Sequence, residues 1–344
     1  MKPLLEIKNL NINYKNSIKA VKDVNFTLED NQIISIVGES GSGKSTLIRA
    51  ILKLLPMGGE IESGNIFFLG KDILSLNKNE LNSLRGKDIG MIFQDPMTSL
   101  NPTIKVGKQI MEGILIHKKV TKEEARQKAI EMLRKVGIPK PEERFHQYPH
   151  EFSGGMRQRA VIAIALSCEP DLLICDEPTT ALDVTIQAQI LDLINELKKE
   201  LNIAVILITH DLGVVAETAD RVVVMYAGEK LEEAPVRELF KNPKHPYTWG
   251  LLKSLPRLDM KMGEKLASIP GTPPDLLKPP VGDPFAPRSE YAMKIDYERK
   301  PPMIDLGNGH FVKSWLYVDG APKIKSPFGS EESDELKNEG MEGK

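Results

Sequence analysis

The sequence predicts an α/β fold built on a parallel β-sheet, and two observations carry that prediction. Four short, largely apolar runs lie at residues 33–37, 172–175, 204–208 and 222–225, and each has the length of a strand buried on both faces. Three of these runs lead directly into glycine-rich or polar residues. Because ligands of open α/β sheets bind at the carboxyl ends of the strands, these three junctions mark the expected site.

Composition limits the classes of protein to which this chain can belong. It has 344 residues, 41% of them hydrophobic, and a net charge of −2. This balance is typical of a globular chain of about two domains and excludes a protein that holds nucleic acid by bulk positive charge. Its two cysteines, Cys168 and Cys175, exclude a disulfide scaffold, and we expect both to be buried and inert.

The chain lacks the apolar stretches that membrane insertion needs. Its first residues contain no run long enough for a signal peptide, and no run approaches the ~18 apolar residues of a membrane span. We therefore expect a soluble, cytoplasmic chain whose membrane role depends on a partner.

Helical patterns predominate between Gln94 and Cys168. A capping box at residues 121–124 precedes apolar residues spaced along one helix face, at positions 125, 129, 132, 133 and 136. A second helix is expected from near Gly154 to about Cys168. The sequence thus predicts a nucleotide-binding domain over residues 1–235, with a helical subdomain at about 95–168 inserted in it.

The composition changes after residue 235. Frequent prolines predict a small, irregular extension over residues 236–325, with one short helix near 247–255. Residues 326–344 are acidic and nearly devoid of apolar side chains, which is typical of a disordered tail.

A phosphate-binding loop follows the first predicted strand. The sequence GESGSGKS at residues 38–45 fits the pattern G-x-x-x-x-G-K-[ST] and leads into a helical pattern, which is the context this motif requires. A glycine-rich turn with a chance lysine is the alternative. In the motif, Lys44 contacts the β- and γ-phosphates, and the Ser45 hydroxyl ligates Mg²⁺. The residues expected to bind ATP here are Gly38, Ser40, Gly41, Ser42, Gly43, Lys44, Ser45 and Thr46.

Two acidic residues end the second predicted strand. Adjacent strand residues point to opposite sides, so Asp176 and Glu177 face different parts of the site. We assign Asp176 to Mg²⁺, and Glu177 to the water that attacks the γ-phosphate, since phosphoryl transfer needs an oriented nucleophile. The alternative, an acidic helix cap, is disfavoured by the phosphate loop.

The stretch FSGGMRQR at residues 152–159 resembles the signature of ABC transporters, which usually reads LSGGQ. Phenylalanine here replaces leucine and methionine replaces glutamine, whereas Ser153, Gly154 and Gly155 are intact. Such residues at a helix N-terminus offer an anion a hydroxyl, exposed amides and a favourable dipole. The resemblance implies composite sites, in which the signature of one subunit closes over ATP on the phosphate loop of another.

The other motifs of this family follow in their usual order. Gln94 resembles the Q-loop glutamine, which contacts Mg²⁺ and reports nucleotide state to the membrane subunit. Asp183, in Ala181-Leu182-Asp183, resembles the D-loop aspartate at the subunit interface, and His210 resembles the switch histidine that contacts the γ-phosphate. Tyr14 matches the aromatic residue that stacks on adenine, although a half-buried strand residue is the alternative.

Four longer segments resemble the ATPase subunits of peptide importers, in particular the D-type subunit of oligopeptide importers in its Gram-positive form. They read QDPMTSLNP (94–102), PTTALDVTIQAQ (178–189), HPYTWGLL (245–252) and IPGTPPDL (269–276). The resemblance covers nearly the whole chain. It implies a RecA-like P-loop NTPase core of the ABC ATPase type, with an N-terminal antiparallel β subdomain, an inserted helical subdomain and an irregular C-terminal extension. It also implies that Lys44, Glu177 and His210 serve ATP hydrolysis.

The resemblance further implies a set of partners. These are a second, non-identical ABC ATPase subunit, two transmembrane permeases that dock near residues 94–105, and an extracellular peptide-binding lipoprotein. No nucleic acid is expected. The chain would then lie on the cytoplasmic face of the membrane as a peripheral subunit.

One departure from the family pattern concerns the extension. Many members carry four cysteines there that ligate an iron–sulfur cluster, and the matching positions in this chain are Asp283, Ser289, Asp296 and Ser314. Since thiolates hold such clusters, we expect no iron–sulfur cluster. We expect apolar residues to fill the extension instead, such as Phe285, Ile295, Phe311, Trp315 and Leu316.

Three alternatives stay open from the sequence. Similar ATPases serve importers of dipeptides, nickel or glutathione, and this subunit does not contact cargo in the family scheme. A non-transport ABC ATPase that acts on DNA or the ribosome is disfavoured, because the chain has neither a long coiled-coil insertion nor a second cassette. A module that binds ATP without hydrolysing it is disfavoured by the presence of Glu177 and His210.

Overall fold

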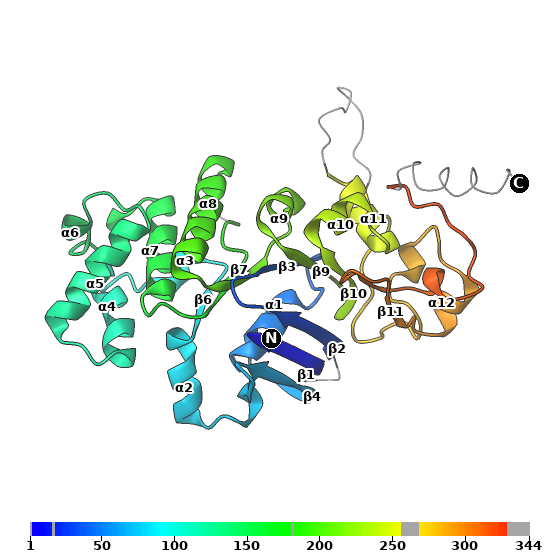
Figure 1. Ribbon diagram of the computed structural model, residues 1–344, viewed down its shortest axis with the longest axis horizontal. Coiled ribbons are helices and arrows are strands. Elements are labelled where there is room, and N and C mark those ends of the chain that lie inside the picture. The colour runs from blue at the N-terminus through cyan, green and yellow to red at the C-terminus, as the bar shows by residue number, and fades with distance from the viewer. Residues whose placement is uncertain (1, 16–17, 181, 256–267, 329–344) are drawn as a thin grey trace, which may run out of the picture.

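The fold is organised around one eight-stranded sheet in the computed structural model, which describes residues 2–15, 18–180, 182–255 and 268–328 (Figure 1). The strands are β3 (Ile33–Val37), β6 (Ile89–Ile92), β7 (Leu172–Asp176), β8 (Ala204–Ile208), β9 (Arg221–Tyr226), β10 (Glu229–Pro235), β11 (Met303–Asp305) and β12 (Phe311–Lys313). Their order is β11-β12-β10-β9-β3-β8-β7-β6, and β9, β3, β8, β7 and β6 pair in parallel. The four buried strands expected from the sequence are β3, β7, β8 and β9, which confirms the α/β fold class.

A second, antiparallel sheet is formed by the N-terminal residues. Its order is β2-β1-β4-β5, with β1 (Leu5–Tyr14), β2 (Ile18–Leu28), β4 (Gly59–Phe68) and β5 (Lys71–Asp72). Helix α1 (Lys44–Ile51) shares one hydrophobic core with both sheets, through Leu47 and Ile48 of the helix, Leu5 of β1 and Ile34 of β3. This core fixes the start of α1, and so the phosphate loop before it, against the central sheet.

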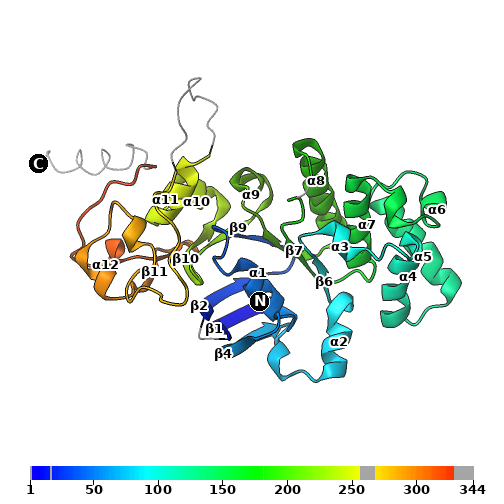
Figure 2. The same cartoon turned by 180° about the vertical axis from the view of Figure 1, so that it is seen from behind.

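Helices gather at the β6 edge of the sheet (Figures 1 and 2). They are α3 (Pro96–Ser99), α4 (Val106–His117), α5 (Lys122–Lys135), α6 (Pro141–Arg144), α7 (Gly154–Leu166) and α8 (Val184–Leu201), while α2 (Lys78–Lys87) precedes β6. The expected capping box is present: Thr121 Oγ1 accepts the Glu124 amide at 3.2 Å, and Glu124 Oε2 accepts the Thr121 amide at 2.7 Å. The five apolar positions predicted around α5 are all buried.

Two further expectations from the sequence concern the cysteines and membrane-spanning helices. Cys168 and Cys175 are both buried, and burial raises the pKa of each thiol, so neither is poised as a thiolate. Within the part of the chain that the structure describes, no helix combines the length and the apolar character needed to span a bilayer.

The C-terminal extension is largely irregular, as its prolines predict, and it also adds two short strands to the central sheet. After α9 (Leu212–Thr218), β9 and β10, it contributes α10 (Val236–Lys241), α11 (Pro246–Lys253) and α12 (Lys294–Glu298). Strand β12 pairs antiparallel with β10, and β11 pairs with β12. The helix expected near 247–255 is α11.

Short 3₁₀ turns lie at Ile73–Ser75, Pro149–Glu151, Ala286–Arg288 and Trp315–Tyr317. The expected tail falls largely on residues 329–344, which lie outside the described residues.

The interior of the extension is more polar than the sequence predicts. Among the apolar residues expected to fill it, only Phe285 is fully buried, and the other four are half-buried. Charged pairs contribute as well: the buried carboxylate of Glu229 pairs with Lys300, which is half exposed, at 2.8 Å and with Lys313 at 2.7 Å. The sequence could not show these pairs because their members lie 71 and 84 residues apart.

Three of the four positions that match cluster cysteines are buried, namely Asp283, Asp296 and Ser314. The Asp283 amide donates to the Asp296 carbonyl at 2.7 Å, and the Asp283 carboxyl accepts the Phe285 amide at 2.9 Å. Burial raises the pKa of Asp283 to about 7, while the Phe285 amide lowers it and the Asp296 carboxylate raises it. The folded state therefore favours the protonated form of the Asp283 carboxyl group.

Asp283 should make the stability of the fold depend on pH. Because its pKa is raised on folding, its contribution is fully present below the unfolded value of 3.8 and is lost as the pH rises through about 7. An Asp283→Asn variant, which keeps the shape without the charge, should therefore unfold at a higher temperature than the unmodified chain at pH 8. The gap should close toward pH 4. Thermal unfolding across this range is the measurement, with Asp319→Asn at an exposed site as the matched control. A gap that does not change with pH would contradict the prediction.

Candidate active site

The phosphate loop lies between β3 and α1, with the backbone geometry that its glycines permit. Gly38 and Gly43 have φ values of 150° and 99°. A Cβ at Gly38 would lie 2.1 Å from the Met225 carbonyl oxygen, and one at Gly43 would lie 2.4 Å from that of Ala20. Only glycine allows the loop to lie this close to neighbouring backbone while holding these dihedral angles.

Lys44 begins α1 and turns back across the loop. Its Nζ donates to the carbonyl oxygens of Gly38 at 2.7 Å and of Glu39 at 2.9 Å. The side chain is only 6% exposed. Burial lowers the pKa of Lys44, and the carboxylates of Glu177 and Asp176 oppose that shift. The loop thus holds an ammonium group inside the space where a phosphate chain would be bound.

Ser45 and Asp176 meet where α1 approaches the end of β7. Ser45 Oγ donates to Asp176 Oδ1 at 2.9 Å, and the Asp176 side chain is fully buried. Its other oxygen, Oδ2, has no hydrogen-bond partner among the described residues and lies 3.6 Å from an Arg49 nitrogen. Burial raises the pKa of Asp176, which Ser45 and Arg49 counteract. A hydroxyl beside a buried carboxylate whose second oxygen accepts no hydrogen bond is a donor set that fits Mg²⁺.

The Glu177 side chain lies at the carboxyl ends of the strands, where residues from three loops surround it. Its Oε2 accepts hydrogen bonds from Thr180 Oγ1 at 2.9 Å and Gln94 Nε2 at 3.1 Å. His210, which follows β8, places Nδ1 3.8 Å from the same oxygen. These contacts hold one carboxylate at the edge of the phosphate cavity, in the arrangement expected of a group that orients a water molecule.

A cavity of about 220 Å³ adjoins the phosphate loop. Its walls are residues 40–46 together with Ala20, Gln94 and Glu177. The structure therefore brings most of the predicted ATP-contacting residues together around one open space. Tyr14, at the end of β1, is half-buried beside it, and its hydroxyl lies 3.3 Å from Thr46 Oγ1.

The signature residues lie outside this cavity's walls as the structure describes them. Ser153 caps α7 by accepting the Met156 amide at 3.3 Å, and Ser153 and Gly154 are exposed. Asp183 caps α8 in the same way, accepting the Ile186 amide at 3.0 Å, and it is exposed too. The single chain thus presents its signature and Asp183 on its surface. Ala181, also part of the D-loop motif, is outside the described residues.

Buried contacts join the signature helix α7 to the loop that follows β7. Gln158 Nε2 donates to the Pro178 carbonyl at 2.5 Å, and Gln158 is fully buried. A Cβ at Gly155 would come 3.1 Å from Ile186 Cγ2, so α7 and α8 approach closely at this point. Gln158 therefore joins the signature helix to Pro178, the residue that follows Glu177.

Sequence reasoning missed two contacts to this site. Thr180, which holds Glu177, lies within the segment 178–189 and could have been singled out by its spacing from Glu177. Arg288 of the extension, which contacts Glu39 of the phosphate loop, is 249 residues away in sequence, and no local pattern indicates that pair.

Comparison with known proteins bears directly on this site and on the extension. Residues 21–180 match the family described as ABC transporter, and residues 231–295 match the family described as oligopeptide/dipeptide transporter, C-terminal region. The chain is 58% identical to the oligopeptide transport ATP-binding protein OppD of Bacillus subtilis, over 94% of this chain and 92% of that one. It is 52% identical to the dipeptide transport ATP-binding protein DppD of Lactococcus lactis, over 93% of each chain.

A solved structure matches the core. It is the dimeric ATP-binding cassette MJ0796 in a post-hydrolysis state with ADP and Pi, 28% identical, with a TM-score of 0.61 over 68% of this chain and 99% of that one. The match covers nearly all of the cassette but only 68% of this chain, so this chain has additional residues outside the shared core. Because the chain is more than 50% identical to both transport ATP-binding proteins over more than 90% of its length, it belongs to the ABC transporter family, within the group of oligopeptide and dipeptide transport ATP-binding proteins.

Proposed function

We propose that this chain is the ATP-hydrolysing subunit that powers the import of oligopeptides through a membrane ABC transporter. The observation that carries the enzymatic part is the carboxylate of Glu177, held by Thr180 and Gln94 beside the phosphate loop. The cargo is supported by the oligopeptide transport relative and by the match of residues 231–295.

The geometry supports a definite role for each residue at the site. The amides of Gly38 and of residues 40–46 bind the phosphates together with the ammonium of Lys44, and Tyr14 stacks on the adenine. Glu177 orients the attacking water, His210 contacts the γ-phosphate, and Gln94 reports the nucleotide state to the membrane subunit. Ser45, Asp176 and Gln94 hold Mg²⁺, which when bound neutralises charge on the phosphate oxygens.

The exposed signature supports a composite site with a second, non-identical ATPase subunit. Ser153, Gly154 and Asp183 are accessible on the surface and do not line this chain's own phosphate cavity. A partner's equivalent residues would therefore close over ATP bound here. The MJ0796 cassette, whose structure is described as dimeric, supports this arrangement.

Docking to the membrane subunits is proposed near residues 94–105. Phe93, which directly precedes this region, is 40% exposed, as suits a residue that a partner covers. Two permeases would bind here, on the cytoplasmic face of the membrane, and an extracellular lipoprotein would deliver the peptide. Closure of the paired ATPases around ATP would switch the permeases, and hydrolysis would reset them.

The cargo is tested by uptake of a labelled peptide series in cells that carry Glu177→Gln in place of the normal chain. Uptake of peptides of several residues should be lost, and dipeptide uptake should persist. Glu196→Gln, which removes one exposed carboxylate from α8, is the control and should leave uptake normal. Loss of dipeptide uptake alone would favour the second candidate, a dipeptide importer, which the Lactococcus lactis relative supports.

A further inference from the structure

The C-terminal extension reaches back to the phosphate loop. We propose that the extension sets the affinity of this loop for ATP through Arg288, a positioning residue that neutralises and holds Glu39, the second residue of the loop. The proposal rests on the proposed function, since it takes ATP as the loop's ligand. It gives the extension a task in the nucleotide cycle of its own chain.

The contact between Arg288 and Glu39 is bidentate. One guanidinium nitrogen, Nη1, lies 2.6 Å from Glu39 Oε2, and the other, Nη2, lies 3.0 Å from Oε1. The Arg288 side chain is 6% exposed and that of Glu39 is 26% exposed, so water screens the pair only weakly. Paired, charge-assisted bonds of this kind are among the strongest and most directional contacts available to a carboxylate.

Arg288 is itself fixed by the extension and by the sheet. Its Nε donates to the Pro270 carbonyl at 2.7 Å, and Nη1 also donates to the Tyr226 hydroxyl at 3.1 Å. The guanidinium lies over the rings of Tyr226 and Phe285. Burial alone would lower the pKa of Arg288, but its hydrogen bonds to Glu39 and Tyr226 raise it, so the group stays charged.

The backbone of Glu39 is held from the same side. Its amide donates to the Tyr247 hydroxyl of α11 at 2.8 Å, and its carbonyl accepts Lys44 Nζ at 2.9 Å. Glu39 is therefore the residue through which the extension and the phosphate-binding lysine are joined. A shift of the extension would be transmitted to Lys44 through one residue.

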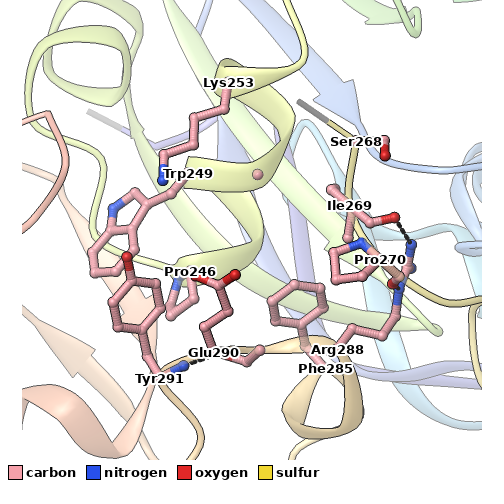
Figure 3. A pocket seen from close by; sticks show the side chains of 12 residues that line it. Pro246, Trp249, Lys253, Ser268, Ile269, Pro270, Phe285, Arg288, Glu290 and Tyr291 are labelled. Carbon is pink, nitrogen blue, oxygen red and sulfur yellow. Dashed lines mark hydrogen bonds between the residues drawn. The ribbon is translucent and has the colours of Figure 1, made fainter. Parts of the chain in front are cut away.

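The segment IPGTPPDL runs alongside these contacts. Arg288 donates to the carbonyls at 269–271, and Figure 3 shows its guanidinium turned toward Ile269. Farther along, Pro273, Pro274 and Leu276 line a cavity of about 160 Å³ together with residues 39–42 of the loop. This segment, which the catalytic roles leave unexplained, thus forms part of the loop's surroundings.

Charge explains why the loop needs this arginine. ATP brings several negative charges to the loop, and an unpaired carboxylate at Glu39 would repel them. With Arg288 present the pair is neutral, and the loop's amides and Lys44 determine the local potential. Removing the arginine alone leaves that carboxylate uncompensated in a poorly hydrated position, whereas removing both charges returns the loop to neutrality.

Glutamine at position 288 is sterically tolerable. Arg288 borders an open cavity of about 170 Å³ between α11 and residues 268–291, so a shorter side chain meets no obstruction (Figure 3). Arg288→Gln removes the charge together with the guanidinium's contacts to the carbonyls at 269–271 and to Tyr226. The double variant lacks the same contacts, so it separates their loss from the loss of charge, and Glu39→Gln is close to isosteric.

The test is a set of equilibrium binding measurements on the full chain with ATP, ADP and AMP in the presence of Mg²⁺. Arg288→Gln should weaken ATP binding by about tenfold, ADP binding by less and AMP binding least. The double variant Glu39→Gln/Arg288→Gln should bind ATP within about twofold of the unmodified chain. Glu39→Gln alone, which leaves the arginine uncompensated, should bind ATP several times more tightly.

Two results would overturn the proposal. One is unchanged ATP binding by Arg288→Gln. The other is equal weakening for all three nucleotides with no rescue in the double variant, which would show a purely structural role. If Arg288→Gln fails to fold, Glu39→Gln alone decides, since unaltered or weaker ATP binding by that variant contradicts the charge argument. An unmodified chain that fails to bind ATP would instead refute the proposed function.

Discussion

Replacing Glu177 with glutamine will lower the rate of ATP hydrolysis by about 10²–10⁴-fold while leaving ATP binding intact. Glutamine has nearly the shape of glutamate and can still accept a hydrogen bond from Thr180, which lies 2.9 Å from the carboxylate. It cannot polarise water as a carboxylate does. The change therefore removes a contribution to the transition state with little effect on the ground state, and kcat should fall while KM for ATP stays close to normal.

The same variant should accumulate as a closed dimer with its partner subunit. In the proposed composite site, ATP would draw the two subunits together and the dimer would separate only after hydrolysis, so slow turnover would prolong the closed state. Size-exclusion chromatography with ATP and Mg²⁺ should show a stable complex for Glu177→Gln and a transient one for the unmodified pair. Single-turnover hydrolysis measured in parallel separates the chemical step from product release.

The control for Glu177→Gln is Glu196→Gln, the same chemical change on the exposed face of α8. It should leave both kcat and dimer lifetime unchanged. Wild-type turnover by Glu177→Gln would show that another group orients the water. His210, with Nδ1 3.8 Å from the Glu177 carboxylate, would then be the first residue to test.

The sequence predicted the candidate site at the carboxyl ends of the strands because the signals for it are local. Each of β3, β7 and β8 is a continuous buried run, and the residues that follow each strand carry its chemistry. Parallel pairing then brings Lys44, Glu177 and His210 to one edge. Short motifs in the sequence identify these three residues, and the structure adds the distances between their side chains and their neighbours.

The extension could not be predicted in the same way because its order depends on pairs that are distant in sequence. Strands β11 and β12 have only three residues each, and they exist because β10 offers an edge to pair with. The frequent prolines of the extension made these two short strands hard to predict from the sequence. The contact between Arg288 and Glu39 joins residues 249 positions apart, and neither residue belongs to a pattern that points to the other.

Replacing Lys44 with alanine will weaken ATP binding by about 100-fold or more and abolish hydrolysis. Each hydrogen bond from a charged group contributes about 1.5–3 kcal/mol, and the ammonium also supplies much of the local positive charge. Lys44 Nζ now binds the carbonyls of Gly38 and Glu39, so the loop is shaped around this group before any phosphate arrives. Alanine removes both the charge and the contacts that shape the loop.

The fold itself should tolerate Lys44→Ala, and this separates a binding defect from misfolding. A buried ammonium is costly, as the lowered pKa of Lys44 reflects, so its loss offsets part of the lost hydrogen bonding. Thermal unfolding without nucleotide should therefore differ little between the variant and the unmodified chain. Added ATP and Mg²⁺ should raise the melting temperature of the unmodified chain and of the exposed-site control Lys8→Ala, but not that of Lys44→Ala, because only a bound ligand stabilises the folded state. A full ATP-dependent rise in Lys44→Ala would place the phosphates elsewhere.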